Sequence, residues 1–123
     1  MRRWLLVVAV ALAACGGEEE GPASEWSSLQ ERPCPEGSVL DWENFGAPFL
    51  QNWCTGCHSA DVAGPARYGA PPGIDLETPA SARHHAARIW ARAADGNETM
   101  PPAGGPGAEE RRLLGEWLAC GAP

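Results

Sequence analysis

Five consecutive residues in the middle of the chain, Cys54-Thr55-Gly56-Cys57-His58, constrain its fold more than any other feature. Two thiols three positions apart at the end of a helix can each form a thioether with one vinyl group of a haem. The histidine that follows is then placed to ligate the iron from the same side. Because Cys-x-x-Cys-His is typical of c-type haem attachment, the sequence predicts one covalently bound haem c, held by Cys54, Cys57 and His58.

The same cysteine spacing has two other interpretations. A thioredoxin-like dithiol also carries Cys-x-x-Cys, but it belongs near a βαβ pattern, and the sequence shows no such pattern. A structural zinc ion needs four ligands. The remaining candidate ligands show no second paired spacing: His84, His85, Cys34 and Cys120. Both interpretations are therefore weaker than haem attachment.

Met100 is the predicted second axial ligand of the iron. It is the only methionine besides the first residue, and it lies in a loop just before two prolines, where a methionine has little core to fill. The prolines stiffen the backbone, which suits a thioether held at a fixed distance from iron. Methionine opposite histidine favours electron transfer and raises the reduction potential. The alternatives are His84 or His85, on a predicted helix, or an open coordination position.

Residues 1–14 are predicted to be a cleaved export signal. Arg2 and Arg3 precede an apolar run of eleven residues, from Trp4 to Ala14. A charged start and a short apolar stretch are typical of a secretory signal, whereas a membrane-spanning helix needs about twenty residues. An uncleaved membrane anchor is the less favoured alternative. Export agrees with the haem prediction, because c-type haem is attached outside the cytoplasm.

The segment Leu12-Ala13-Ala14-Cys15 resembles the lipobox of bacterial lipoproteins, in which the cysteine after the cleavage site takes the lipid. The resemblance implies lipid on Cys15 and a protein tethered to the periplasmic side of a bacterial membrane. Gly16 stands where inner-membrane lipoproteins carry an aspartate, which favours the outer membrane in a Gram-negative host. The alternative is cleavage elsewhere, with Cys15 incidental.

A chain that begins at Cys15 has 109 residues and a strongly acidic balance. Its seven arginines face sixteen carboxylates, which gives a net charge of −9 before any cofactor is counted. Such a surface argues against nucleic-acid binding, which needs basic stripes. It favours a basic or mixed-charge protein partner approached with electrostatic steering, although charge that only keeps a protein soluble would look the same.

The two cysteines outside the motif and the lipid site, Cys34 and Cys120, are predicted to form a disulfide. They are the two cysteines that are left after the motif and the lipid site are assigned, and an exported protein meets an oxidising environment. On the chain-entropy model, a loop that closes nearly the whole domain contributes about 4 to 5 kcal/mol to stability, less any native strain. The alternative is two free thiols.

The composition divides the chain after the signal into two parts. Residues 15–35 are rich in Glu, Gly, Pro and Ser and are predicted to be a flexible tether. Residues 36–123 are predicted to form one small domain. The sequence leaves open whether Trp26 and Leu29 pack on that domain.

Helical spacing of apolar residues recurs three times in the domain, over 42–54, 79–95 and 108–119. Asp41 and Thr78 are predicted N-caps, and Gly96 suits the stop of the second helix. Pro48 leaves three options for the first helix, which begins at Trp42, begins at Ala47 or kinks. Pro/Gly-rich loops separate the helices, over 59–77 and 99–107. With no strand-like alternation of useful length, the predicted fold is all-α.

Residues 40–123 resemble a class I cytochrome c. That family has an apolar N-terminal helix that runs into Cys-x-x-Cys-His, a methionine on a loop, and a C-terminal helix that crosses the first. Its helix crossing pairs a glycine and an aromatic residue with an aromatic on the last helix, and the candidates here are Gly46, Phe49 and Trp117. The interval of 42 residues from His58 to Met100 is similar to that of compact bacterial members. The Cys34–Cys120 pair is not part of the family pattern.

The resemblance implies a small cytochrome c-like fold around one haem, and a monomeric carrier that takes electrons from one redox protein and gives them to another. It also implies a proline carbonyl, from Pro65 or Pro71, that holds the second nitrogen of His58. Arg67 or Arg88 is the candidate counter-charge for the haem propionates.

No residues are arranged as a general acid, nucleophile or substrate pocket, so the chain is not predicted to be an enzyme. Asp75 and Asp95 are interpreted as solvated carboxylates. Two other functions stay open: a haem enzyme or gas sensor with an open iron position, and the haem subunit of a dehydrogenase complex.

Overall fold

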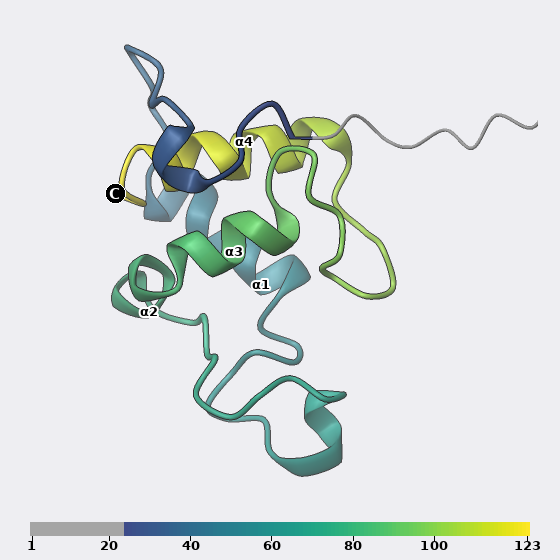
Figure 1. Ribbon diagram of the computed structural model, residues 1–123. Helices are drawn as coiled ribbons and strands as arrows, with labels where there is room; N and C mark the ends of the chain where they lie inside the picture. The colour runs from purple at the N-terminus through teal and green to yellow at the C-terminus, as the bar shows by residue number, and fades with distance from the viewer. Residues whose placement is uncertain (1–23) are drawn as a thin grey trace, which may run out of the picture.

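The structure, a computed structural model, describes residues 24–123. All regular elements of this part of the chain are helical, which confirms the predicted all-α class. The α-helices are Ala47–Trp53 (α1), Pro79–His84 (α2), Ala86–Ala93 (α3) and Ala108–Ala119 (α4) (Figure 1). The shorter turns are Leu29–Glu31 (η1, 3-10), Trp42–Gly46 (η2, π-helical) and Gly64–Arg67 (η3, 3-10).

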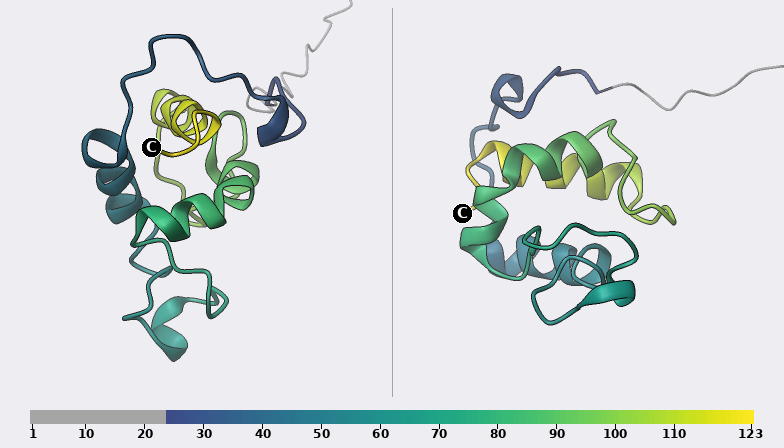
Figure 2. Two further views of the ribbon diagram at one scale, coloured as in Figure 1. Left: turned by 90° about the vertical axis from the view of Figure 1, so that its left-hand side faces the viewer. Right: turned by 60° about the horizontal axis from the view of Figure 1, so that its bottom comes forward.

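The predicted signal peptide and the lipid-bearing Cys15 lie outside the described residues. Within those residues, none of the helices has the length and apolar character needed to cross a bilayer. The predicted tether ends at residue 35, and its last part is described: η1 lies against α3 and α4 (Figure 2). The packed unit therefore begins earlier in the chain than the predicted boundary at residue 36.

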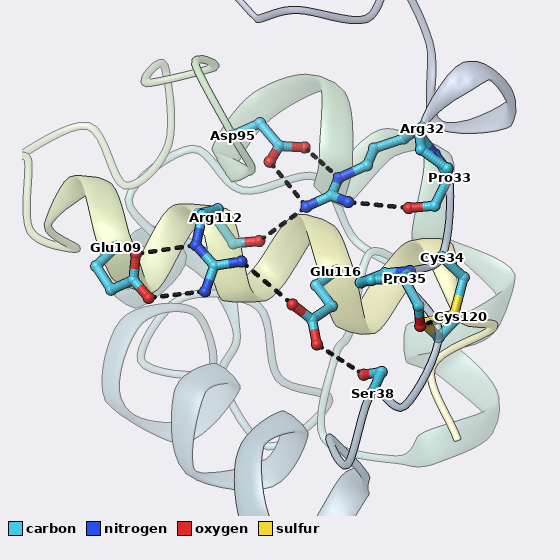
Figure 3. A network of polar contacts seen from close by, with 10 residues as sticks. All are labelled: Arg32, Pro33, Cys34, Pro35, Ser38, Asp95, Glu109, Arg112, Glu116 and Cys120. Atoms are coloured by element: carbon cyan, nitrogen blue, oxygen red, sulfur yellow. Dashed lines mark hydrogen bonds and ion pairs between the residues drawn. A yellow bond between two sulfur atoms is a disulfide. The ribbon is translucent and has the colours of Figure 1, made fainter.

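A buried ion pair holds this N-terminal segment in place. The Nε atom of Arg32 lies 3.2 Å from Oδ2 of Asp95, and both side chains are less than a tenth exposed (Figure 3). The guanidinium also lies over the Trp26 ring, 4.5 Å from its centre. The interpretation of Asp95 as a solvated carboxylate is therefore wrong. Its counter-charge comes from a residue 63 positions earlier in the chain, which no local pattern reveals.

The first helical segment resolves the question that Pro48 left open. Asp41 accepts a hydrogen bond from the backbone N–H of Asn44 at 2.7 Å and so caps the turn η2, as predicted. The α-helix proper begins at Ala47. Pro48 then falls in its first turn, where the missing N–H has no helical partner to lose.

The predicted second helix is wrong as a single element, because the chain breaks at His85 into α2 and α3. Thr78 caps α2 by accepting from the N–H of Ser81 at 3.1 Å, as predicted. At His85 the backbone leaves the α-helical region, with φ −98° and ψ 10°. The apolar residues on either side are mostly alanines, and alanine spacing does not record a change of helix axis. α3 ends at Ala93, two residues before the predicted end.

The core forms around α4, which contacts both α3 and η2, and η2 leads directly into α1. Trp117 of α4 is fully buried, and Gly46 of η2 lies directly against its ring, as the resemblance implies. The aromatic partners of Trp117 are Trp42 and Phe45, each with ring centres 6.2 Å away. Phe49, the aromatic predicted for this crossing, instead stacks on Phe45 and faces the cavity described below.

The close approach of Gly46 to Trp117 makes a direct prediction. A Cβ atom at position 46 would overlap the indole ring, so Gly46→Ala must displace either helix or ring. Overpacking of this kind costs about 1–3 kcal/mol. Chemical denaturation should show a lower free energy of unfolding for Gly46→Ala. Gly56→Ala is the matched control, since a Cβ there meets no atom within 4 Å. Equal stability of the two variants would contradict the crossing.

The structure pairs Cys34 with Cys120 in a disulfide that closes a loop with a sequence separation of 86 residues (Figure 3). A loop of that length constrains the unfolded chain by about 4 to 5 kcal/mol on the entropy model. The double variant Cys34→Ser/Cys120→Ser should therefore unfold at a clearly lower denaturant concentration than the parent. Adding a thiol reductant should destabilise the parent and leave the variant unchanged. If the reductant destabilises the parent and the variant equally, the Cys34–Cys120 disulfide is not the source of the destabilisation.

Candidate functional site

A cavity of about 560 Å³ opens between the end of α1, the loop over 59–77, α3 and the loop after Met100. Its volume lies within the range of about 300–1,000 Å³ that small-molecule and cofactor sites occupy. Most of its wall is apolar, and its residues are Phe49, Trp53, Cys54, Cys57, His58, Arg67, Tyr68, Gly69, Ala70, Pro71, Ile74, Leu76, His85, Arg88, Ile89, Arg92, Ala93, Met100, Pro101, Pro102 and Ala103. The wall includes three arginines and no carboxylate.

The chain turns sharply after α1 and brings the Cys-x-x-Cys-His motif to this cavity. Cys54 closes the helix by donating its N–H to the Leu50 carbonyl at 2.8 Å. The N–H groups of Cys57 and His58 then both donate to the Cys54 carbonyl, at 3.1 and 2.9 Å. These bonds form one tight turn, so both thiols and the imidazole line the same wall.

Both motif cysteines are free thiols and half-buried. Burial raises the pKa of the Cys54 thiol from 9.0 to about 12. A dithiol that exchanges disulfides needs the opposite, because its attacking sulfur must be a thiolate near neutral pH. The chemistry of Cys54 therefore does not favour the thioredoxin-like interpretation.

His58 is held at two points by one short segment of the loop. Its Nδ1 donates to the carbonyl oxygen of Ile74 at 3.0 Å, and its own carbonyl accepts from the N–H of Leu76 at 2.9 Å. A carbonyl only accepts, so this bond places the proton on Nδ1 and leaves the Nε2 lone pair free for a metal. The predicted supports, Pro65 and Pro71, are wrong as partners of His58.

Arg67 explains why the loop presents Ile74 to the histidine. The residue is 5% exposed, and its guanidinium donates to five backbone carbonyls at 2.5–3.3 Å. The acceptors are the carbonyls of Ser59, Val62, Ala70, Pro71 and Ile74. Five bonds use the full donor set of an arginine. No donor of Arg67 is left for a propionate, so that prediction is not supported for Arg67.

Asp75 completes the charge balance of Arg67. Its Oδ1 lies 2.9 Å from Nη2 of Arg67, and its side chain is a quarter exposed. The interpretation of Asp75 as a solvated carboxylate is therefore also wrong. A buried guanidinium needs an anion nearby, and the two residues are eight positions apart on an irregular loop, where no periodicity relates them.

Met100 reaches the same cavity from the opposite loop. Its backbone N–H donates to the Arg92 carbonyl at 2.8 Å, and its own carbonyl accepts from Nη1 of Arg111 at 2.9 Å. Arg111 is buried and also donates to the carbonyls of Ala93, Asn97 and Pro106. The loop that carries Met100 is thus fixed by a second buried arginine.

Sequence reasoning missed Arg111, although a signal for it exists. The residue precedes Leu114 by three positions and Leu118 by seven, so helical spacing places it on the buried face of α4. A cation on such a face needs internal partners, which here are loop carbonyls.

The rival ligands are separated by the structure. His85 lines the cavity, whereas His84 is exposed and does not. Their rings contact each other edge to face, 4.7 Å apart. Arg88 and Arg92 follow His85 on the exposed side of α3, and both line the cavity with no ion pair to another described residue.

No family model, curated protein or solved structure matches this chain. Within residues 24–123, no group of three or more His, Cys, Asp or Glu side chains gathers as a metal site. The candidate function therefore depends on the geometry of the cavity.

The raised pKa of Cys54 predicts slow alkylation of the haem-free chain. A pKa near 12 leaves about a thousandfold less thiolate at pH 8 than a pKa of 9.0, partly offset by higher intrinsic nucleophilicity. We expect iodoacetamide to label Cys54 at least about tenfold more slowly in the folded chain than in urea. The folded rate should keep rising with pH up to about 12, since only the thiolate reacts. Peptide mass spectrometry would show fast labelling at pH 8 if Cys54 were an activated thiol.

Proposed function

We propose that this chain is a mono-haem c-type cytochrome that transfers electrons, with His58 and Met100 as axial ligands and lipid on Cys15 as its membrane anchor. One observation carries the proposal: the cavity of about 560 Å³ is lined together by Cys54, Cys57, His58 and Met100. Residues 58 and 100 come from different loops, and their approach to one apolar space is what a haem between two axial ligands requires.

The residues of the cavity fit a haem in chemical type. Cys54 and Cys57 would hold it through two thioethers, and His58 offers Nε2 because its Nδ1 is occupied by Ile74. Met100 offers a thioether sulfur from a loop whose backbone is bonded on both sides. With a haem in place, the apolar part of the wall would exclude water from it. When bound, a haem supplies an iron centre that exchanges one electron reversibly.

Arg88 and Arg92 are the proposed counter-charges for the two propionates. They lie one turn apart on α3, on the cavity wall. All five donors of Arg67 are bonded to backbone carbonyls, so Arg88 and Arg92 are the arginines of the described wall whose donors could bind the propionate carboxylates. Arg92 was not among the predicted counter-charges, although it lies off the apolar face of its helix as Arg88 does.

Electron transfer is favoured over catalysis by how firmly the ligand candidates are held. A carrier works best when its ligands move little between oxidation states, and both ligand-bearing loops are held by buried arginines. Among the cavity residues, Tyr68 and His85 are the titratable side chains outside the motif and the arginines. A haem enzyme or gas sensor with an open iron position is the alternative, and a haem subunit of a dehydrogenase complex is a third.

The proposed carrier works from the periplasmic side of a membrane, with the outer membrane favoured. Its partners are a redox protein donor and acceptor with basic or mixed-charge surfaces. We propose a cytochrome c-like fold for the domain, on the basis of the helix crossing at Gly46 and Trp117 and the placement of the motif.

Visible spectra of protein matured in a host with c-type haem machinery test this function. The reduced parent should show a low-spin c-type spectrum that carbon monoxide does not change. Met100→Ala should keep the haem covalently attached, lower the reduction potential and bind carbon monoxide, because an axial ligand is lost. His85→Ala is the matched control and should behave as the parent. A high-spin parent that binds carbon monoxide would favour an open-site enzyme or sensor. If His85→Ala bound carbon monoxide and Met100→Ala behaved as the parent, His85 would be the axial ligand.

A further inference from the structure

We propose that Arg67 is a positioning residue that raises the reduction potential of the iron through the carbonyl group of Ile74. This inference rests on the proposed function, because a reduction potential exists only when haem is attached. It assigns a role to the most extensively bonded side chain of the cavity wall, whose five donors the proposed binding of haem does not use.

The Ile74 carbonyl oxygen is shared between the candidate iron ligand and a buried cation. Nδ1 of His58 donates to it at 3.0 Å, and Nη2 of Arg67 donates to it at 3.3 Å. A carbonyl oxygen has two lone pairs and can accept both bonds. The electronic state of the histidine therefore depends on a residue that does not touch it.

The direction of the effect follows from hydrogen-bond chemistry. An acceptor on the second nitrogen makes a histidine ligand more basic, and a more basic ligand stabilises the oxidised metal. A guanidinium that donates to the same oxygen withdraws electron density from it and weakens this acceptor. His58 then donates less charge to iron, the ferric state is stabilised less, and the reduction potential rises.

Asp75 opposes this effect and supplies a test of opposite sign. Its carboxylate lies 2.9 Å from Nη2 of Arg67, the same nitrogen that contacts Ile74. Removing the anion without changing the side-chain shape leaves the cation unopposed.

Redox titration of the matured protein tests the inference with three variants. Arg67→Gln should move the redox equilibrium toward the oxidised form by roughly three- to tenfold, where tenfold is about 59 mV for a one-electron couple. Asp75→Asn should move it toward the reduced form. Arg112→Gln, on the exposed side of α4 among Glu109 and Glu116, is the matched control and should not move it (Figure 3).

A second readout separates this role from a merely structural one. In the reduced protein, the Nδ1 proton of His58 should resonate at higher chemical shift in Arg67→Gln, because the bond to Ile74 becomes stronger. In Asp75→Asn it should move to lower shift. Loss of loop structure alone would not shift the reduction potential in opposite directions in the two variants. It would not shift the Nδ1 proton resonance in opposite directions either.

The outcomes that overturn the inference are specific. The inference is rejected if the haem stays attached but the redox equilibria of Arg67→Gln and Asp75→Asn both stay within about twofold of the parent. It is also rejected if both potentials move in the same direction. If Arg67→Gln does not mature, Asp75→Asn decides alone, since it keeps all five carbonyl bonds. A parent without a covalent haem spectrum rejects the proposed function itself, and that result is seen before any potential is measured.

Discussion

Hydrogen bonds from two buried arginines hold the cavity together. The loops over 59–77 and 94–107 are rich in glycine and proline, and proline has no N–H to donate. A buried carbonyl without a donor costs about 1–3 kcal/mol. Arg67 satisfies five carbonyls of the first loop, and Arg111 satisfies four in and beside the second. The carbonyls of Ser59 and Pro71 also accept from backbone N–H groups of the first loop, and the two arginines add the donors that the prolines lack.

Both axial-ligand candidates depend on these arginines. His58 is oriented by Ile74, whose carbonyl Arg67 also binds, and Met100 is bonded to Arg111 through its own carbonyl. The two ligand candidates are therefore positioned from the backbone side, while most of the wall between them is apolar. Such an arrangement suits a cofactor that needs fixed ligands, because the arginine donors that fix the loops are bonded to backbone carbonyls.

Local features of the chain could be predicted from its sequence, and long-range ones could not. The caps at Asp41 and Thr78 and the bounds of α4 follow from residues within one or two turns, and the structure agrees with them. The motif Cys54–His58 predicted where a cofactor would bind, because the spacing of its three side chains is typical of haem attachment. Those three side chains line the cavity. Gly46 against Trp117 was accessible only through a family resemblance, since the two residues are 71 positions apart.

The features that sequence reasoning missed share one physical cause. The Arg32–Asp95 pair and the Arg67 bonds join a side chain to a distant charge or to backbone carbonyls. A carbonyl belongs to every residue, so the identity of Ile74 as the support of His58 leaves no trace in residue type. The break at His85 has a similar origin, because alanine packs equally well on a straight or a broken helix.

The charges of the cavity wall and of the whole chain have opposite signs, and this contrast constrains the proposed partner. Residues 24–123 contain seven arginines and thirteen carboxylates, yet the charged residues of the wall are Arg67, Arg88 and Arg92. Out to about a Debye length, which is about 10 Å at 0.1 M salt, an approaching partner senses the net acidic charge. Closer in, a basic partner would meet Arg88 and Arg92 unless two carboxylates neutralised them. In the proposed cytochrome, the two propionates of the haem would supply these carboxylates, and a basic or mixed-charge partner could then approach this wall.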